Sequence, residues 1–221
     1  MEEAVGADRA RRTAVSPDRL DPARTCLLLF DLLEGHVKRD AAARERFHPV
    51  LANAAALLAA ARRVGAMVAY ANADHRPDDR HPGLRDTDNR LRPVTAESDR
   101  PAIVRGTPEA RVVAELAPQA SDYIVPKHRW SAFHGTYLDI ALRTRNVDTI
   151  VLCGGSTDVG VAATAFAARD FDYNLLIVSD ACTSPEQDNH AQFMQRIFPR
   201  MARIRTSAEV LQMFGAPLED C

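Results

Sequence analysis

The sequence has little of what marks several large protein classes. It lacks a basic excess, because 28 Lys and Arg stand against 30 Asp and Glu, so a nucleic-acid partner held through its phosphates is not expected. No apolar run approaches the roughly 18 residues of a membrane span, and the first twelve residues hold no apolar segment typical of a secretory signal. Cysteine is scarce, with no Cys-x-x-Cys pair and no disulfide framework. We expect a cytoplasmic globular protein with reduced, mostly buried thiols.

What is present is an alternation of short apolar runs with segments of helical periodicity. The apolar runs, expected to be strands, lie at 25–30, 67–70, 123–125, 149–152, 174–178 and 202–204. The helical segments are expected at 44–64, 109–116, 136–143, 158–169, 190–198 and 208–213. This order predicts an α/β fold: a single Rossmann-like three-layer α/β/α domain with a mostly parallel sheet of about six strands.

Two segments fall outside that alternation. Residues 1–22 are charged and contain two prolines, and we predict an N-terminal arm lying on the surface or on a neighbouring subunit. Residues 23–221 are then the domain. Residues 72–107 are rich in charge, proline and glycine, which is typical of a functional loop or lid, or equally of a variable, partly disordered insertion.

The stretch 150–164 is the centre of the predicted site. It predicts a buried strand that breaks at Gly154 and Gly155 and turns into a helix, whose N-terminus favours negative charge. It is not a phosphate loop, because neither glycine motif of that kind is present. Asp31 and Lys127 also follow predicted strands. Ligands of parallel sheets bind outside the carboxyl ends of the strands, so we expect these positions to meet there.

The same pieces resemble a known family. They are Leu-Leu-Leu-Phe-Asp at 27–31, Lys-His-Arg-Trp-Ser-Ala-Phe at 127–133, Thr-Tyr-Leu at 136–138, the turn 154–164 and Asp-Ala at 180–181. Over roughly residues 24–210 the chain resembles the isochorismatase-like hydrolases, or cysteine hydrolase superfamily. The resemblance implies a catalytic aspartate at Asp31, a catalytic lysine at Lys127 and a cis peptide at 155–156. It also implies a small-molecule substrate and a homo-oligomer, dimer or tetramer; we expect no cofactor.

The third catalytic position of the family falls on Gly160. The family pattern Thr-Asp-x-Cys-Val reads Thr-Asp-Val-Gly-Val at 157–161, so the nucleophilic cysteine is missing. A thiolate at a helix N-terminus beside an ammonium attacks amides readily. Without it, the site retains an acid, a cation and backbone donors, which can still protonate a bound molecule and admit water. A natural divergence and an engineered Cys→Gly replacement would both give this pattern.

Three functional hypotheses follow. Isochorismatases and related phenazine-pathway hydrolases, implied by the glycine, cleave a vinyl ether: the aspartic acid protonates carbon and water traps the cation. Asp31 would have to be protonated, which Lys127 opposes and burial or an anionic substrate favours. The second hypothesis is an amide or carbamoyl hydrolase of the cysteine type that lost its nucleophile, since Ser-Thr-Asp at 156–158 resembles that branch. The third is a non-catalytic binding protein.

Five further residues are candidates for substrate binding. They are Gly155, Ser156, Thr157, Trp130 and Phe133. The two hydroxyl residues are equally explained as helix N-caps, and the two aromatic residues as core.

A metal site is not predicted. Nicotinamidases of this superfamily bind a metal through Asp-x-His and a later His, whereas here Asp74 and His75 are adjacent, and neighbouring side chains on an extended segment point opposite ways. His81 would be the later ligand. Arginines at 85, 90 and 92 are expected either to receive a substrate carboxylate or to be solvated.

Overall fold

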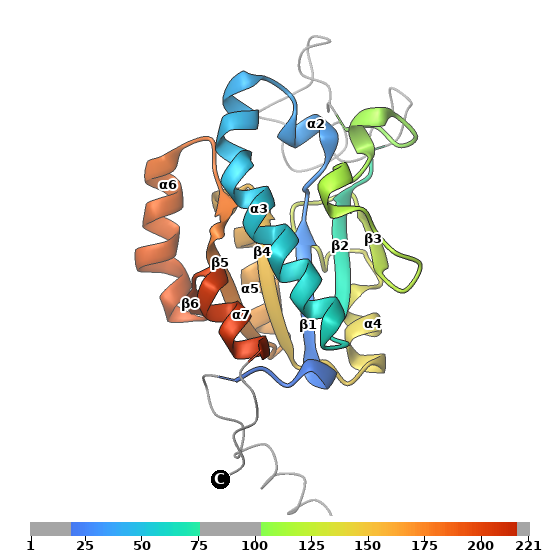
Figure 1. Ribbon diagram of the computed structural model, residues 1–221, viewed down its shortest axis with the longest axis vertical. Coiled ribbons are helices and arrows are strands. Elements are labelled where there is room, and N and C mark those ends of the chain that lie inside the picture. Colours follow the sequence, from blue (N-terminus) through green and yellow to red (C-terminus); the bar gives the residue numbers. More distant parts are fainter. Residues whose placement is uncertain (1–18, 76–102, 216–221) are drawn as a thin grey trace, which may run out of the picture.

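The computed structural model describes residues 19–75 and 103–215, which form one parallel sheet between two layers of helices (Figure 1). The strands are β1 (Thr25–Phe30), β2 (Met67–Ala73), β3 (Tyr123–Lys127), β4 (Thr149–Gly155), β5 (Asn174–Thr183) and β6 (Arg203–Arg205). Their order is β3-β2-β1-β4-β5-β6, and every pairing between them is parallel. The predicted fold class is confirmed, and the sheet is parallel throughout.

Helices cover both faces of this sheet. They are α2 (Glu34–Val37), α3 (Ala41–Arg63), α4 (Leu138–Thr144), α5 (Ala162–Asp170), α6 (Gln187–Gln192) and α7 (Ser207–Gly215). Figure 1 shows α3 and α7 together on one face, with α4 and α5 on the other. A π-helical segment, Thr157–Val161, joins β4 to α5. A second one, Phe193–Ile197, follows α6.

The two central strands, β1 and β4, are buried along their whole length. Their sequences are continuous apolar runs because both faces of a parallel sheet are covered by helices. Full burial of each aliphatic side chain contributes about 1.5–3 kcal/mol. The prediction of a strand at 25–30 is confirmed, and β4 runs three residues farther than the predicted 149–152, through Gly155.

Helix α3 positions one wall of the site. It begins after Asp40, whose carboxylate accepts a hydrogen bond of 2.7 Å from the Ala43 N–H, and the chain turns away at Gly65 with a φ of 76°. Its buried face is formed by Ala43, Phe47, Val50, Ala54, Leu57, Leu58, Ala60 and Ala61. The Phe47 ring lies against Gly155, where an added Cβ would come 2.8 Å from the ring.

Two helix predictions are wrong in detail. The segment 109–116 is not a helix but two short 3₁₀ turns, Pro108–Ala110 and Ala114–Leu116. Between them the Val113 N–H donates to the Leu32 carbonyl at 3.2 Å, which holds the chain extended. The helix expected at 190–198 begins three residues earlier and ends as π and 3₁₀ turns, where Pro199 removes a backbone donor.

The segments expected to lie outside the core are only partly described. Leu20, placed in the predicted arm 1–22, is buried, and its N–H donates to the Met213 carbonyl at 3.2 Å. The first residues of the predicted loop 72–107 belong to the end of β2, and 76–102 lie outside the described residues. None of the described helices has the length and apolar character that crossing a membrane requires.

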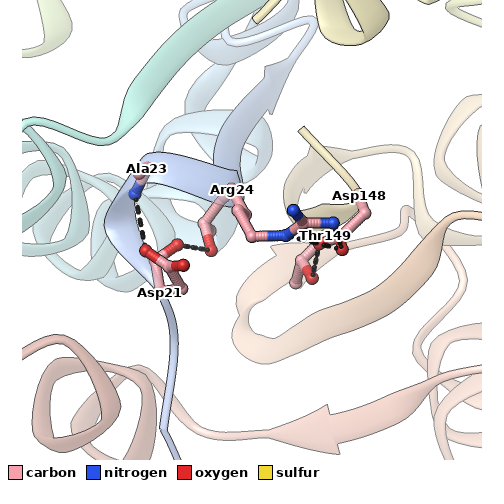
Figure 2. A network of polar contacts seen from close by, with 6 residues as sticks. Asp21, Ala23, Arg24, Asp148 and Thr149 are labelled. Atoms are coloured by element: carbon pink, nitrogen blue, oxygen red, sulfur yellow. Dashed lines mark hydrogen bonds and ion pairs between the residues drawn. The ribbon is translucent and has the colours of Figure 1, made fainter. Parts of the chain in front are cut away.

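A polar network joins β1 to β4 where these strands begin (Figure 2). The Arg24 guanidinium donates to the Asp148 carboxylate at 2.9 Å, and the Asp148 N–H donates to the Arg24 carbonyl at 3.0 Å. Thr149 adds a hydroxyl donor to the same carboxylate, at 2.9 Å. This network fixes the amino edge of the sheet, opposite the predicted site.

Candidate active site

Asp31 follows β1 directly and lies at the carboxyl edge of the sheet. Its side chain is nearly buried, with one oxygen accepting a hydrogen bond from the Ala73 N–H at 2.7 Å. Its backbone has a φ of 51°, a left-handed conformation that non-glycine residues adopt infrequently. Backbone strain of this kind concentrates at functional sites. The carboxylate of Asp31 is thereby held against the end of β2, at Ala73.

Lys127 is the last residue of β3 and provides the second charge of the site. Its ammonium donates to the second carboxylate oxygen of Asp31 at 2.7 Å, and both side chains are at most one-tenth exposed. In register, Lys127 lies beside Ala73, whose N–H bonds the same carboxylate. The structure thus brings two predicted residues that are far apart in sequence into one buried ion pair.

The third predicted position, Gly160, is linked to this pair through the Phe30 ring, which contacts both Gly160 and the Lys127 ammonium. A Cβ added to Gly160 would come 2.3 and 2.5 Å from two ring carbons of Phe30. The Lys127 ammonium sits over the same ring, 4.3 Å from its centre. The site therefore consists of a carboxylate, an ammonium and a helix start, arranged around a buried aromatic ring.

The turn that carries Gly160 has an irregular backbone. Gly154 has a φ of 132° and packs so closely on β1 that a Cβ there would come 2.1 Å from the Phe30 carbonyl oxygen. The peptide bond between Gly155 and Ser156 is cis, as the resemblance implies. The Val161 N–H donates to the Ser156 carbonyl five residues back, at 3.1 Å. Single π turns of this type are rare in proteins overall, and those that occur often lie at functional sites.

Ser156 occupies the N-cap position of the turn, but its side chain bonds to a neighbouring side chain instead of capping the helix. Its hydroxyl donates to the Asp158 carboxylate at 2.5 Å, and that carboxylate also accepts from the Ser184 hydroxyl and from the Asn189 amide at 2.8 Å. Burial acts to raise the pKa of Asp158, but the hydrogen bonds outweigh it and hold the pKa below its usual value. This cluster ties the turn to the segment that follows β5.

Thr157 is fully buried and is likewise not a helix cap. Its hydroxyl lies 2.9 Å from Nδ1 of His190 in α6. Burial lowers the pKa of His190, although the nearby Asp158 carboxylate opposes the shift. Ser156 thus occupies the predicted N-cap position, but neither hydroxyl makes a capping hydrogen bond, because the Ser156 hydroxyl donates to Asp158 and the Thr157 hydroxyl pairs with His190.

The two aromatic candidates lie in different surroundings. Phe133 is in the core, its ring centre 5.3 Å from that of Phe171 and 5.8 Å from that of Tyr173. Those two residues precede β5, so Phe133 faces the amino edge of the sheet, away from Asp31, and we leave it out of the site. Trp130 is 67% exposed, so it is not a core residue.

Asp74 and His75 are engaged with neighbouring segments. The Arg105 guanidinium donates to the Asp74 carboxylate at 2.8 Å and holds the pKa of that carboxyl below its usual range. His75 pairs with Val104 through a β-bridge. His81 and the three loop arginines lie outside the described residues. Within the described ranges, no three His, Cys, Asp or Glu side chains are grouped as metal ligands.

Comparisons with known proteins place the chain in a family. The profile of the isochorismatase domain family matches residues 25–209. The chain belongs to the isochorismatase family. It is 33% identical over 198 residues to the isochorismatase family protein YwoC of Bacillus subtilis, covering 87% of this chain and 95% of that protein. Members of the isochorismatase family are hydrolases, and so is this protein.

Other relatives show the range of this family. Maleamate amidohydrolase of Pseudomonas putida is 28% identical over 86% of each chain. The phenazine biosynthesis protein PhzD1 of Pseudomonas aeruginosa is 34% identical over about half of each (49% of this chain, 53% of the relative). The crystal structure of a cysteine hydrolase from Pseudomonas syringae superposes with a TM-score of 0.75 and 28% identity, covering 88% of this chain and 94% of that one. The isochorismatase family thus includes both amide hydrolases and proteins of phenazine synthesis.

Two features of the site are not predicted from the sequence. The apolar pattern places Phe30 in a strand without a role in the site, and the family motif includes Asp158 without indicating its hydrogen bonds. An aromatic residue directly before Asp31, in a chain with glycine at 160, was the one available signal for the first. Nothing in the sequence indicated that Asp158 would gather two serines and an asparagine.

Proposed function

We propose that this isochorismatase-family hydrolase cleaves a small anionic enol ether, with Asp31 as general acid and water as nucleophile. The observation that carries the proposal is the buried Asp31–Lys127 pair beside residue 160, which has no side chain. An acid and a cation are in place, and no covalent enzyme intermediate is required.

The side-chain nucleophiles described near the turn are engaged or inaccessible. The Ser156 hydroxyl is bonded to Asp158, and Thr157 is fully buried against His190. Cys153 and Cys182 are buried inside β4 and β5; burial raises the pKa of Cys153 well above its usual value and that of Cys182 to about 12. Neither thiol is then available as a thiolate near neutral pH. With these described side chains near the turn engaged or buried, we assign the role of nucleophile to water.

The reaction that fits these groups has three chemical steps: protonation of carbon, addition of water and breakdown of a hemiketal. The substrate carboxylate binds the Lys127 ammonium, and its negative charge favours the protonated form of Asp31. Asp31 then gives its proton to the terminal carbon of the enol ether, whose π electrons form the new C–H bond and leave an oxocarbenium ion. Water adds to the cationic carbon and returns a proton to Asp31. The resulting hemiketal breaks its C–O bond to give a ketone and an alcohol.

A second candidate substrate class is a small amide or carbamoyl compound. It is favoured by the match to maleamate amidohydrolase, which covers more of the chain than the match to PhzD1. In that reaction Asp31 would take a proton from water and pass it to the leaving amine. The turnover assay below separates the two classes.

The test is turnover by the purified chain on a mixed panel read by mass spectrometry. The panel holds isochorismate-type enol ethers, N-carbamoyl acids and small carboxamides. We expect hydrolysis of an enol ether, lost in Asp31→Asn and retained in Asp148→Asn, which changes a carboxylate at the opposite edge of the sheet. Asparagine tolerates the left-handed backbone of residue 31, so the variant isolates the carboxylic acid. Turnover of amides alone, or of nothing on the panel, would overturn the proposal.

We further propose that the enzyme acts in the cytoplasm on a secondary metabolite, as a homo-oligomer. Support for the oligomer comes from apolar side chains exposed on the α4–α5 face, among them Ile140 and Phe166. Light scattering during size-exclusion chromatography tests this part, and a monomer at micromolar concentration would contradict it.

A further inference from the structure

Phe30 occupies a singular position in this site. It is the last residue of β1 and is only 1% exposed. Its ring contacts both Gly160 and the Lys127 ammonium. On one side the ring meets Gly160, and over its face lies the Lys127 ammonium, 4.3 Å from the centre. Neither the proposed acid mechanism nor the ion pair alone explains why an aromatic ring stands there.

The contact with Gly160 leaves no room for a side chain at that position unless the Phe30 ring moves. Non-bonded carbon atoms rest about 3.5–4.0 Å apart, whereas a Cβ on residue 160 would be 2.3 Å from the nearest ring carbon. The backbone of Phe30 is fixed between β2 and β4, in register with Ala71 and Gly154, and the residue is buried, so its ring can move only by displacing packed neighbours. Close-packed interiors transmit such an overlap as strain.

The contact with Lys127 acts on the charge. An ammonium over an aromatic face is attracted by the ring's electron density, more strongly when water is excluded. Lys127 has its other partner in Asp31, at 2.7 Å. The ring and the carboxylate thus hold one ammonium from two directions.

We infer that Phe30 determines the reaction class of this site: its ring takes the volume of a side-chain nucleophile at residue 160 and positions the Lys127 ammonium against Asp31. Phe30 and Gly160 form a size-complementary pair. The site therefore differs from that of a cysteine hydrolase in more than the loss of the cysteine side chain, because the Phe30 ring takes the space of that side chain. The positioning part rests on the proposed function, because it needs Asp31 and Lys127 to be the reacting pair. The steric part stands without it.

The steric part is tested by adding the thiol back. In a Cys221→Ser background, which removes the cysteine outside the described residues, we would compare Gly160→Cys, Phe30→Val and the double variant. The other thiols, Cys26, Cys153 and Cys182, are buried. The readouts are thermal unfolding and iodoacetamide labelling of the introduced thiol, located by peptide mass spectrometry.

Gly160→Cys alone should lower the melting temperature. The same change should lower it far less when it is made in the Phe30→Val background. The introduced thiol should react roughly tenfold or more faster in the double variant, where it can settle beside Lys127 at the helix start. Equal melting temperatures and equal labelling rates in the single and double variants would overturn the inference. Both readouts work without substrate, so that outcome leaves the proposed function standing.

The positioning part is tested by Phe30→Leu, which keeps an apolar side chain and removes the aromatic face. We expect the pH profile of enol-ether turnover to shift. The melting temperature and the substrate KM should stay close to those of the unmodified protein. An unshifted pH profile would overturn this part. Labelling as expected together with no turnover by any variant, the unmodified chain included, would instead overturn the proposed function.

Discussion

The two edges of the sheet each carry an ion pair in a different environment. At the amino edge Arg24 and Asp148 join the starts of β1 and β4, and their side chains are 35% and 37% exposed (Figure 2). At the carboxyl edge Lys127 and Asp31 join the ends of β3 and β1, and their side chains are 5% and 10% exposed. We call the partly exposed Arg24–Asp148 pair the solvated pair and the buried Lys127–Asp31 pair the dry pair.

We interpret that difference as one between a structural pair and the pair proposed to act in the reaction. An exposed pair contributes little, and a buried pair must overcome the cost of desolvating both charges. Apolar residues in place of the buried pair would serve stability at least as well. Asp31 adds a left-handed backbone, a further cost. Charges kept in such a place are most simply explained by chemistry, and the variants below test that explanation.

The largest effect is expected from Asp31→Asn. General acid catalysis contributes about 10²–10⁴-fold, so enol-ether turnover should fall by that factor while the fold persists. Initial rates measured by mass spectrometry check the loss, and circular dichroism checks the fold. Asp148→Asn, the matched change at the amino edge, should leave the rate within about twofold. Equal rates for the two variants would remove the distinction between the edges.

The second largest effect is expected on stability, when one partner of the dry pair is removed. Lys127→Met keeps the aliphatic stem but leaves Asp31 charged and unpaired, so the free energy of unfolding should fall by about 3–5 kcal/mol. Urea unfolding monitored by fluorescence measures it. A loss below about 1 kcal/mol would mean that the pair is solvated in solution.

An intermediate effect is expected from Asp158→Asn, which removes the charge and replaces one of two acceptor oxygens by an amide donor, so the hydrogen bonds from Ser156, Ser184 and Asn189 cannot all be kept. The free energy of unfolding should fall by about 1 kcal/mol near pH 7. Because the pKa of Asp158 is lowered on folding, its stabilisation is present above the unfolded value of about 3.9 and is lost as pH falls through the folded value. The gap to the unmodified protein should therefore narrow below about pH 4. A gap that widens there would contradict the assigned hydrogen bonds.

The smallest effect is expected from Arg24→Gln at the solvated edge. The loss should be about 0.2–1 kcal/mol and should shrink in 1 M salt, where exposed charges are screened. Unfolding curves at low and high salt measure it. A loss as large as that of Lys127→Met would show that exposure does not separate the two pairs.

The sequence predicted the fold well and the site only in part. Continuous apolar runs announce buried parallel strands, and the strand-end rule correctly placed Asp31 beside Lys127. The role of Phe30 could not be predicted, because hydrophobic periodicity records that a residue is apolar, not which distant glycine accommodates its ring. The side-chain caps predicted for Ser156 and Thr157 are absent for a similar reason. Their hydroxyls also contact Ser184 and His190, which come after β5, and local preference does not include such distant partners.

The most direct test of the central claim is the fate of solvent hydrogen in a single turnover. An isochorismate-type enol ether would be hydrolysed in D₂O, the keto product trapped at once by reduction, and product and intact protein weighed by mass spectrometry. Asp31 acting as the acid predicts deuterium on the former enol-ether carbon and a protein of unchanged mass throughout. Product without that deuterium, or a mass added to the protein during turnover, would contradict hydrolysis by an acid and water alone.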